Sequence, residues 1–182
     1  MEIRIDEHIK LQQTSPEHAG GLLEAVDQNR DHLSRFLPWV GNMQKVTDFD
    51  QYIQYCMDLY DQQQEISFVI LSDQTIVGRI GLHHINQQNK SAAIGYWLNR
   101  DMEGKGIISR SCRKIIDLAF NEFGLNRIEI KAAVENTKSQ AIPQRLGFQR
   151  EGILRQSELV NGIFLDLVIF SMLKDEWNYS VE

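Results

Sequence analysis

Residues 92–109, AAIGYWLNRDMEGKGIIS, form the stretch of sequence that decides the fold. Residues 92–98 are rich in the apolar and aromatic side chains typical of strands, and Gly104 and Gly106 mark a turn before a helical pattern begins. A strand that ends at a glycine turn and leads directly into a helix presents unpaired main-chain N–H groups, and the positive end of the helix dipole, to an anion such as a pyrophosphate. The spacing therefore predicts an anion-binding turn at residues 104–109.

Two better-known phosphate-binding loops do not fit this turn. A Walker A loop would need glycine at position 99 and Ser or Thr at position 106, where the chain has Asn99 and Gly106. A Rossmann loop needs a third glycine at the position where Ser109 stands. With 12 glycines in the chain, Gly-x-Gly pairs also arise by chance, and a plain turn before a helix is the alternative interpretation. The turn indicates an anion-binding site only because a strand precedes it and a helix follows it.

A long amphipathic helix is expected after the turn, with Gly124 as its C-terminal cap. Its buried stripe, at spacings of three and four, consists of Ile108, Cys112, Ile115, Ile116, Ala119 and Phe123. Its outer face carries Arg110, Arg113, Lys114 and Asp117. The basic side chains suit a phosphate group by charge, but only Lys105 belongs to the turn itself, and a solvated helix face is the alternative for the others.

The residues before this stretch alternate between strand and helix patterns. Residues 9–13 alternate as a strand, and the Ser-Pro-Glu of residues 15–17 supplies an N-cap, a first helical position and an acidic first turn. A second amphipathic helix begins near Thr47, its expected cap. An antiparallel meander follows, with strands at residues 66–71, 76–82 and 92–98.

The residues after the long helix continue in the same mixed order. Residues 127–134 alternate as a strand, residues 137–146 form a short helix, and residues 148–154 form another strand. The Asn161–Gly162 pair predicts a tight hairpin turn into a last strand at residues 163–173. We therefore expect a mixed α+β fold, with a largely antiparallel sheet flanked by helices.

Composition limits the function. The chain has 182 residues, 42% of them hydrophobic, with 19 Lys and Arg against 25 Asp and Glu, so its net charge is −6 and its pI is about 5.4. These values predict a single globular domain over residues 1–182 and argue against disorder and against a dedicated nucleic-acid-binding protein, which needs clustered positive charge. Cys56 and Cys112 form no spaced set, and no signal-like or membrane-spanning apolar run is found, so we expect a cytoplasmic protein without disulfides or membrane contact.

Five segments in a fixed order now resemble a known family. They are residues 94–98 (IGYWL), 103–107 (EGKGI), 136–139 (NTKS), 145–148 (RLGF) and 151–152 (EG). Together they are similar to the signature of the GNAT N-acetyltransferases, and more closely to that of the Rim-type ribosomal-protein N-terminal acetyltransferases. One departure is Asp101, where the family's loop often has Arg or Gln three residues before the first glycine.

The resemblance implies an acetyl-CoA-dependent enzyme with the GNAT fold, a central sheet of about seven strands. In that family a splay between two strands, here those ending near Leu98 and Val134, admits the pantetheine arm of CoA, which hydrogen-bonds along the free strand edge. The cofactor-binding residues implied are Trp97, Leu98, Gly104, Lys105, Gly106, Ile107, Ile108, Ser109 and Asn136. Asn136 is independently a good N-cap for the helix that follows it.

The resemblance also implies two catalytic residues. Glu158 matches the family's general base, although a carboxylate beside a hairpin turn is more commonly just solvated. Ser139 matches a general acid for the CoA sulfur, although a serine near a helix start often serves as a cap. Pro143 lies four residues beyond Ser139, cannot donate to its carbonyl and should bend the helix.

Four further side chains have an ordinary structural role as the alternative to a functional one. Trp39 resembles the aromatic segment that borders the acceptor pocket of Rim-type enzymes, and its alternative is a core or loop anchor. His83 and His84 do not indicate a metal site, because adjacent strand residues face opposite ways and no third ligand has the spacing. Cys112 lies on the buried stripe without a histidine partner, so we expect direct attack on the thioester without an acyl-enzyme.

The leading functional hypothesis is an enzyme that acetylates the N-terminal amine of a protein, and a basic ribosomal protein is a candidate acceptor that agrees with the acidic charge of the chain. One alternative is an acetyltransferase for a small amine, such as a polyamine, an amino acid or an antibiotic. Another is an acyl-CoA-binding sensor without turnover. A homodimer or higher homo-oligomer is expected only because related enzymes often pair through their sheet edges.

Overall fold

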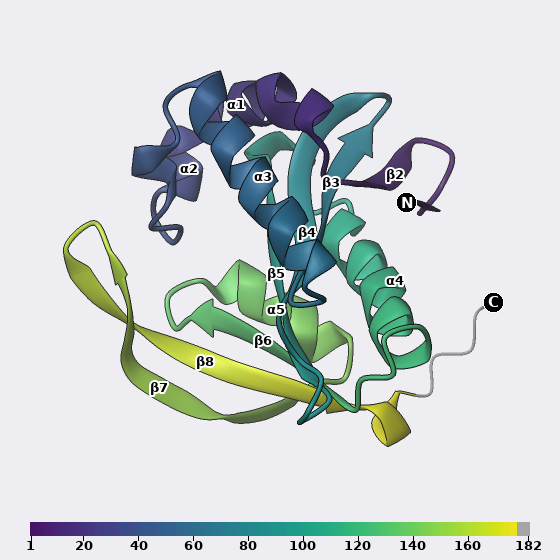
Figure 1. Ribbon diagram of the computed structural model, residues 1–182. Coiled ribbons are helices and arrows are strands. Elements are labelled where there is room, and N and C mark those ends of the chain that lie inside the picture. The colour runs from purple at the N-terminus through teal and green to yellow at the C-terminus, as the bar shows by residue number, and fades with distance from the viewer. Residues whose placement is uncertain (178–182) are drawn as a thin grey trace.

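The computed structural model describes residues 1–177 and contains one eight-stranded sheet, in the spatial order β1-β2-β3-β4-β5-β6-β8-β7 (Figure 1). The strands are β1 (Glu2–Arg4), β2 (Ile9–Gln13), β3 (Ile66–Ser72), β4 (Thr75–Asn86), β5 (Ser91–Leu98), β6 (Arg127–Ala133), β7 (Gln149–Val160) and β8 (Ile163–Leu173). All neighbouring strands are antiparallel except β5 and β6, which are parallel. The expected mixed α+β fold with a largely antiparallel sheet is confirmed.

Helices cover both faces of the sheet. They are α1 (Ala19–Asp27), α2 (Arg30–Leu33), α3 (Val46–Asp61), α4 (Ile107–Asn121) and α5 (Thr137–Arg145). Buried side chains of α1 and α3 cluster with Val69, Leu71 and Trp97 of the sheet, whereas those of α4 cluster with the opposite face. Figure 1 shows α3 and α4 on either side of the central strands. We call the sheet face that carries α1 and α3 the α3 face.

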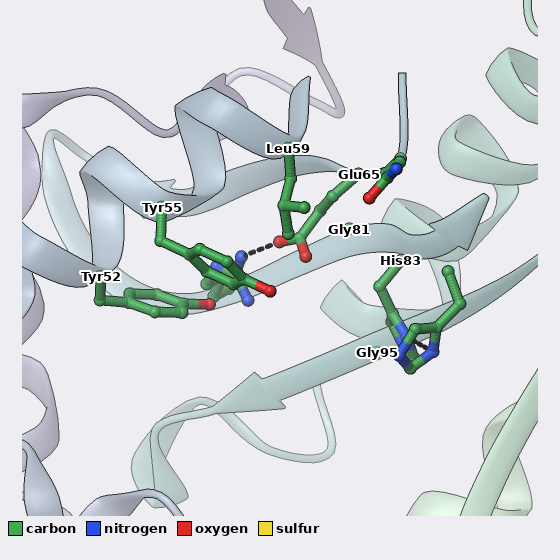
Figure 2. A pocket seen from close by; sticks show the side chains of 10 residues that line it. Tyr52, Tyr55, Leu59, Glu65, Gly81, His83 and Gly95 are labelled. Carbon is green, nitrogen blue, oxygen red and sulfur yellow. Dashed lines mark hydrogen bonds and ion pairs between the residues drawn. The ribbon is translucent and has the colours of Figure 1, made fainter. Parts of the chain in front are cut away.

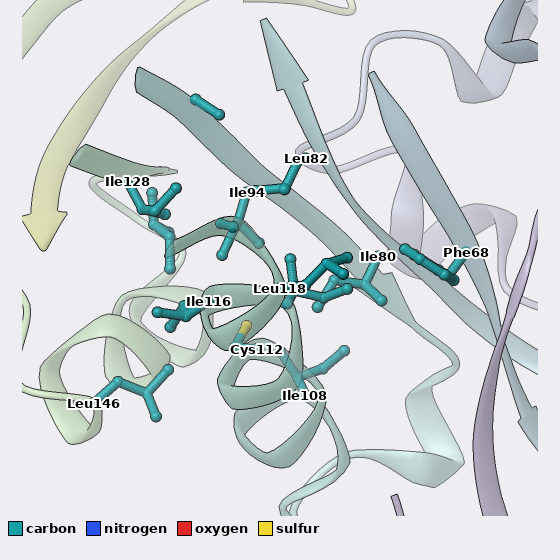
Figure 3. Packing of buried hydrophobic residues seen from close by; sticks show 14 of the residues in the cluster. Phe68, Ile80, Leu82, Ile94, Ile108, Cys112, Ile116, Leu118, Ile128 and Leu146 are labelled. Atoms are coloured by element: carbon teal, nitrogen blue, oxygen red, sulfur yellow. The ribbon is translucent and has the colours of Figure 1, made fainter. Parts of the chain in front are cut away.

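The larger core lies between α4 and the sheet (Figure 3). Cys112, Ile115 and Ile116 of the predicted stripe are fully buried, and Ile80, Leu82 and Ile94 meet them from the strands. Each of these isoleucine and leucine side chains contributes about 1.5–3 kcal/mol by leaving water. This core fixes α4, and therefore the turn before it, against the end of β5.

The parallel strands β5 and β6 separate along their length. Their pairing is confined to the row Ser91, Ala92 and Ala93 against Arg127, Ile128 and Glu129. Beyond Ala93, β5 stays paired to β4 as far as Leu98, and β6 stays paired to β8 as far as Ala133. The two strands therefore present facing edges without ladder hydrogen bonds, which is the splay that the resemblance implied.

The hairpin of β7 and β8 turns at Asn161 and Gly162. Their φ values are +50° and +79°, so both central residues of the turn are left-handed, as a type I′ hairpin requires. Asn161 Nδ2 donates a hydrogen bond of 2.8 Å to the carbonyl of Ser34, after α2. This contact places the tip of the hairpin against the segment that follows α2.

Several element boundaries differ from the sequence expectation. The sheet has an additional short strand, β1, which the sequence did not predict because it is only three residues long. The cap of α3 is not Thr47: the helix begins at Val46, and Asp48 Oδ2 accepts from the amides of Gln44 and Lys45 at 2.9 Å. β7 continues six residues past the expected end at Leu154, beyond a register shift between Leu154 and Glu158. No helix within residues 1–177 is long and apolar enough to span a membrane.

Candidate active site

The predicted anion turn is formed by two left-handed glycines. Gly104 has φ +77° and Gly106, the N-cap of α4, has φ +70°. Within residues 1–177 the amides of residues 104–109 donate to no main-chain carbonyl, and the first helical bond of α4 runs from the Arg110 amide to the Gly106 carbonyl. The turn therefore offers a run of free N–H donors at a helix start, where negative charge is favoured.

Side chains around the turn reinforce this chemistry. Ser109 Oγ is buried and has no hydrogen-bond partner among the described residues, so an oxygen of a bound diphosphate would satisfy it. Arg110 braces the turn, because it donates to the Lys105 carbonyl at 3.1 Å and to Asp6 Oδ2 at 2.9 Å. Lys105 itself is exposed. These observations fit the diphosphate of CoA.

Trp97 and Leu98 occupy the part of β5 that faces the splay. Leu98 pairs with Gly78 and Trp97 with Arg79 on the β4 side, which leaves the other edge of β5 free for a ligand backbone. Both side chains are buried, Trp97 on the α3 face and Leu98 on the α4 side. A ligand that binds along this edge of β5 thus has buried, packed side chains on both faces of the strand.

Ser139 lies beside the splay, held by three hydrogen bonds. Asn136 Oδ1 accepts from the Ser139 amide at 3.1 Å, which confirms Asn136 as the N-cap of α5. Tyr96 Oη donates to the Ser139 carbonyl at 2.9 Å, and Ser139 Oγ donates to Tyr96 Oη at 3.3 Å. The carbonyl is free to accept because Pro143, the fourth residue on, has no N–H.

Glu158 is half-buried on β7, opposite Leu165 of β8. Leu165 has the same strand parity as Ile169, which pairs with Lys131 of β6, while the alternate residues Val168 and Phe170 enter the core under α4. The Glu158 side chain therefore lies on the α3 face of the sheet. Burial raises the pKa of its carboxyl group above the ordinary value, which favours proton acceptance.

Trp39 packs on Trp97. The ring centroids are 6.2 Å apart with an interplanar angle of 50°, a tilted aromatic contact. Because Trp97 belongs to the free-edged part of β5, this contact places Trp39 on the α3 face near the splay.

Two functional candidates were missed from the sequence. Tyr96 stood inside the quoted IGYWL segment, but nothing in the sequence indicated that it would reach Ser139. Glu103 Oε1 lies 3.2 Å from His32 Nε2 of α2, and its Oε2 lies 2.5 Å from Lys138 Nζ of α5. Glu103 therefore ties the turn to two helices, a long-range pairing that spacing does not reveal.

The structure also describes the two histidines and the cysteine for which the sequence indicated no metal-binding or nucleophilic role. The expectation that His83 and His84 face opposite ways is wrong: the pairing of β4 with β5 is irregular after His83, His84 has φ +53°, and the two Nδ1 atoms lie 2.9 Å apart. No group of three potential metal ligands occurs within residues 1–177. Cys112 is fully buried, and burial raises the pKa of its thiol. A buried, protonated thiol is a poor nucleophile.

Comparisons with known proteins agree with this geometry. Residues 8–149 match the acetyltransferase (GNAT) domain family. The chain is 40% identical over 177 residues to the Bacillus subtilis protein named "Putative ribosomal N-acetyltransferase YdaF", covering 96% of both chains, and 29% identical over 173 residues to the ribosomal-protein-serine acetyltransferase of Escherichia coli, covering 95% of this chain and 97% of that one.

A solved structure of RimL, described as a ribosomal L7/L12 alpha-N-protein acetyltransferase in complex with coenzyme A, superposes with a TM-score of 0.92 at 25% identity. The superposition covers 97% of this chain and 99% of that one. The family model matches most of the chain, a relative is similar along nearly the full length, and a structure solved with coenzyme A has the same fold. The chain belongs to the GNAT acetyltransferase family and is an acetyl-CoA-dependent N-acetyltransferase, close to the ribosomal-protein acetyltransferases.

Proposed function

We propose that the enzyme acetylates the N-terminal α-amine of a protein, and that this acceptor is a ribosomal protein. The observation that carries the proposal is the free-amide turn at Gly104–Ser109 beside a splay that opens onto the same sheet face as Glu158. The relatives named for ribosomal acceptors support the choice of a protein N-terminus. The single domain, residues 1–182, would supply every group described below.

CoA binding is assigned to three parts of the chain. The amides of Gly104–Ser109 and the Ser109 hydroxyl bind the diphosphate, with Lys105 at the turn for charge attraction. The free edge at Trp97 and Leu98 aligns the pantetheine arm, and Asn136 lies at the far side of the splay, where its carboxamide can reach the arm while capping α5.

Glu158 acts as the general base. An N-terminal amine has a reference pKa of roughly 7.7–8.0, so a substantial neutral fraction exists near neutral pH and a carboxylate with a raised pKa suffices to take its proton. Glu158 accepts that proton, directly or through one water, as the new C–N bond forms. The neutral amine is the attacking group, and no covalent intermediate on the enzyme is needed.

Ser139 acts as the general acid. Its hydroxyl proton goes to the sulfur as the C–S bond breaks, and Ser139 recovers a proton from solvent. In the structure the hydroxyl donates to Tyr96 Oη at 3.3 Å, so the side chain must turn from Tyr96 toward the sulfur. Trp39, on Trp97, borders the path of the acceptor.

The test of this proposal is thiol release from acetyl-CoA with defined amines. We expect turnover with short peptides that have a free N-terminus, and little with spermidine, free amino acids or aminoglycosides. Peptides with an acetylated N-terminus and an internal lysine serve as controls. Turnover with small amines alone would contradict the proposal, and CoA binding without any turnover would indicate a sensor.

A further inference from the structure

A cavity of about 330 Å³ opens between α3 and the strands β4 and β5 (Figure 2). Tyr52 and Tyr55 of α3 line one side, and His83 and Gly95 line the other. Figure 2 shows the two tyrosine rings over β4 and the His83 ring beside Gly95 on the neighbouring strand. The His84 ring lies edge-on to the His83 ring, with centroids 4.7 Å apart. The chemistry proposed above does not use this cavity.

The cavity adjoins the splay. Gly95 lies beyond Ala93, in the part of β5 whose outer edge is free, and it has the same strand parity as Trp97 on the α3 face. Lys131 of β6 is close enough to His83 for its charge to act on the imidazole. The cavity therefore opens on the face to which Glu158 belongs, next to the place where the acceptor amine must arrive.

The charges in the cavity wall cancel. Arg79 Nη2 lies 2.7 Å from Glu65 Oε1, with both side chains largely buried. The Arg79 guanidinium also lies 4.9 Å from the centroid of the Tyr52 ring, a cation–π contact. Among the described residues that line the cavity, the only carboxylate is thus already paired, and the only guanidinium is covered by an aromatic ring.

The remaining polar groups of the wall are mostly neutral. Burial lowers the pKa of His83 to about 4, helped by the nearby charges of His84, Arg79 and Lys131, so the imidazole is uncharged at pH 7. Burial raises the pKa of Tyr52, whose hydroxyl therefore stays protonated. Apart from the exposed His84, the wall offers aromatic surface and neutral hydrogen-bonding groups.

From this arrangement we infer that the cavity is a specificity pocket that receives an uncharged side chain, polar or aromatic, from the first two residues of the acceptor peptide. The inference rests on the proposed function and adds the class of acceptor. A charged side chain would lose its hydration there without finding a free counter-charge. A polyamine, with several ammonium groups, meets the same obstacle.

Gly95 is the position at which the pocket can be filled. A Cβ built on Gly95 would meet only His83 ring atoms, Nε2 at 3.1 Å and Cδ2 at 3.2 Å, which belong to a side chain that can move. Gly81, its partner on β4, is unsuitable because a Cβ there would meet the Ile66 carbonyl oxygen at 2.5 Å. Gly95→Val therefore places a strand-compatible side chain in the pocket and keeps the ladder.

The experiment measures kcat/KM for two peptide series, one varied at residue 1 and one at residue 2, each with Gly, Asn, Tyr, Asp and Lys. For the wild-type enzyme we expect Asn or Tyr to exceed Asp and Lys by about 10-fold or more in one series, the scale of one well- or ill-matched side chain in a pocket. Calorimetric titration of CoA accompanies every variant, to show that the protein is folded and binds its cosubstrate.

Two variants and one control locate the effect. Gly95→Val should raise KM about 10-fold or more for the Tyr peptide and little for the Gly peptide, with the same CoA affinity. Tyr55→Ala, at a side chain that is 59% exposed and so not needed for folding, should lower only the preference for Tyr. Gly152→Val is the matched control, since it adds the same side chain to β7 where a Cβ meets nothing within 4 Å.

The outcomes separate the pocket from the function. Peptide acetylation without side-chain preference, or equal losses of kcat/KM for all peptides in Gly95→Val, would overturn the pocket and leave the proposed function standing. A wild-type enzyme that binds CoA and acetylates no peptide would overturn both. Preference for Lys peptides would show that the wall carries an unpaired negative charge and would also overturn the inference.

Discussion

Tyr96 of β5 donates a hydrogen bond of 2.9 Å to the main-chain carbonyl of Ser139 of α5, beside the splay between β5 and β6. In a regular helix that carbonyl would accept from the fourth residue on, which here is Pro143. A phenol from the sheet thus replaces the missing helical donor. The residue proposed as the general acid is held by the strand that is proposed to hold the cosubstrate.

Tyr96→Phe should therefore lower the free energy of unfolding by about 1–3 kcal/mol, the cost of an unsatisfied buried acceptor, and lower kcat more than CoA affinity. In that background Pro143→Ala restores an N–H to the helix and should recover part of the stability. A double-mutant cycle by chemical denaturation measures the coupling. Additive effects of the two substitutions would show that Tyr96 and Pro143 do not share the carbonyl.

Glu158→Gln should reduce kcat/KM by about 100-fold or more, the usual effect of removing a general base, without changing CoA affinity. Glu122→Gln, at an exposed carboxylate after α4, is the control. Unchanged turnover in Glu158→Gln would remove Glu158 from its proposed role.

The pH profile gives an independent check on the same group. Only the ionised form of Glu158 accepts a proton, so kcat/KM should fall as the pH drops through its pKa, and burial places that pKa above the ordinary carboxyl value. In Glu158→Gln this limb of the profile should disappear. The measurement is kcat/KM against pH with a peptide whose amine is the only other titrating group.

Gly104→Val should weaken CoA binding by about 10-fold or more. A Cβ at this position meets nothing within 4 Å, so the effect comes from the left-handed backbone at φ +77°, which costs an L-residue about 1–2 kcal/mol. A valine that relaxes to a normal φ would turn the free amides away from the diphosphate. Gly20→Ala, on an α1 position that is equally open and not left-handed, should bind CoA normally.

The Arg127–Glu151 pair should make stability depend on acid pH. Two hydrogen bonds, of 2.8 and 2.6 Å, join the guanidinium to the carboxylate and lower the pKa of Glu151 from 4.5 to about 2, with help from Ser171. A carboxyl with a lowered pKa stabilises the fold above its ordinary pKa, and this stability is lost as the pH falls from about 4.5 towards about 2.

Glu151→Gln should remove that acid-dependent part of the stability, by about 1 kcal/mol because solvent screens a partly exposed pair. Unfolding by urea at pH 7 and at pH 3 gives the comparison. A wild-type protein that loses no more stability than Glu151→Gln between these two values would contradict the assignment.

The sequence predicted the order of the main elements because their causes are local. The apolar stripe of α4, the glycines of the turn and the Asn161–Gly162 hairpin each act within a few residues, and each is found in the structure. The cap of α3 was misplaced because the helix begins at Val46, before Thr47, and Asp48 in its first turn accepts from the amides of Gln44 and Lys45 that precede the helix.

The features that could not be predicted depend on distant contacts. Tyr96 and Ser139 are 43 residues apart, and Lys138 and Glu103 are 35 apart, and only the sheet and α5 together bring each pair into contact. The specificity pocket likewise combines α3 with β4 and β5, and its chemistry depends on the Arg79–Glu65 ion pair. Periodicity and spacing contain no information on such pairings.

The most direct test of the account is calorimetric titration of the full-length protein with CoA and, separately, with pantetheine, which has the same arm and lacks the diphosphate. If the free amides of residues 104–109 bind the diphosphate, CoA should saturate one site per chain and pantetheine should bind about 100-fold more weakly or not measurably. Equal affinity for the two compounds, or no heat with CoA, would contradict the account.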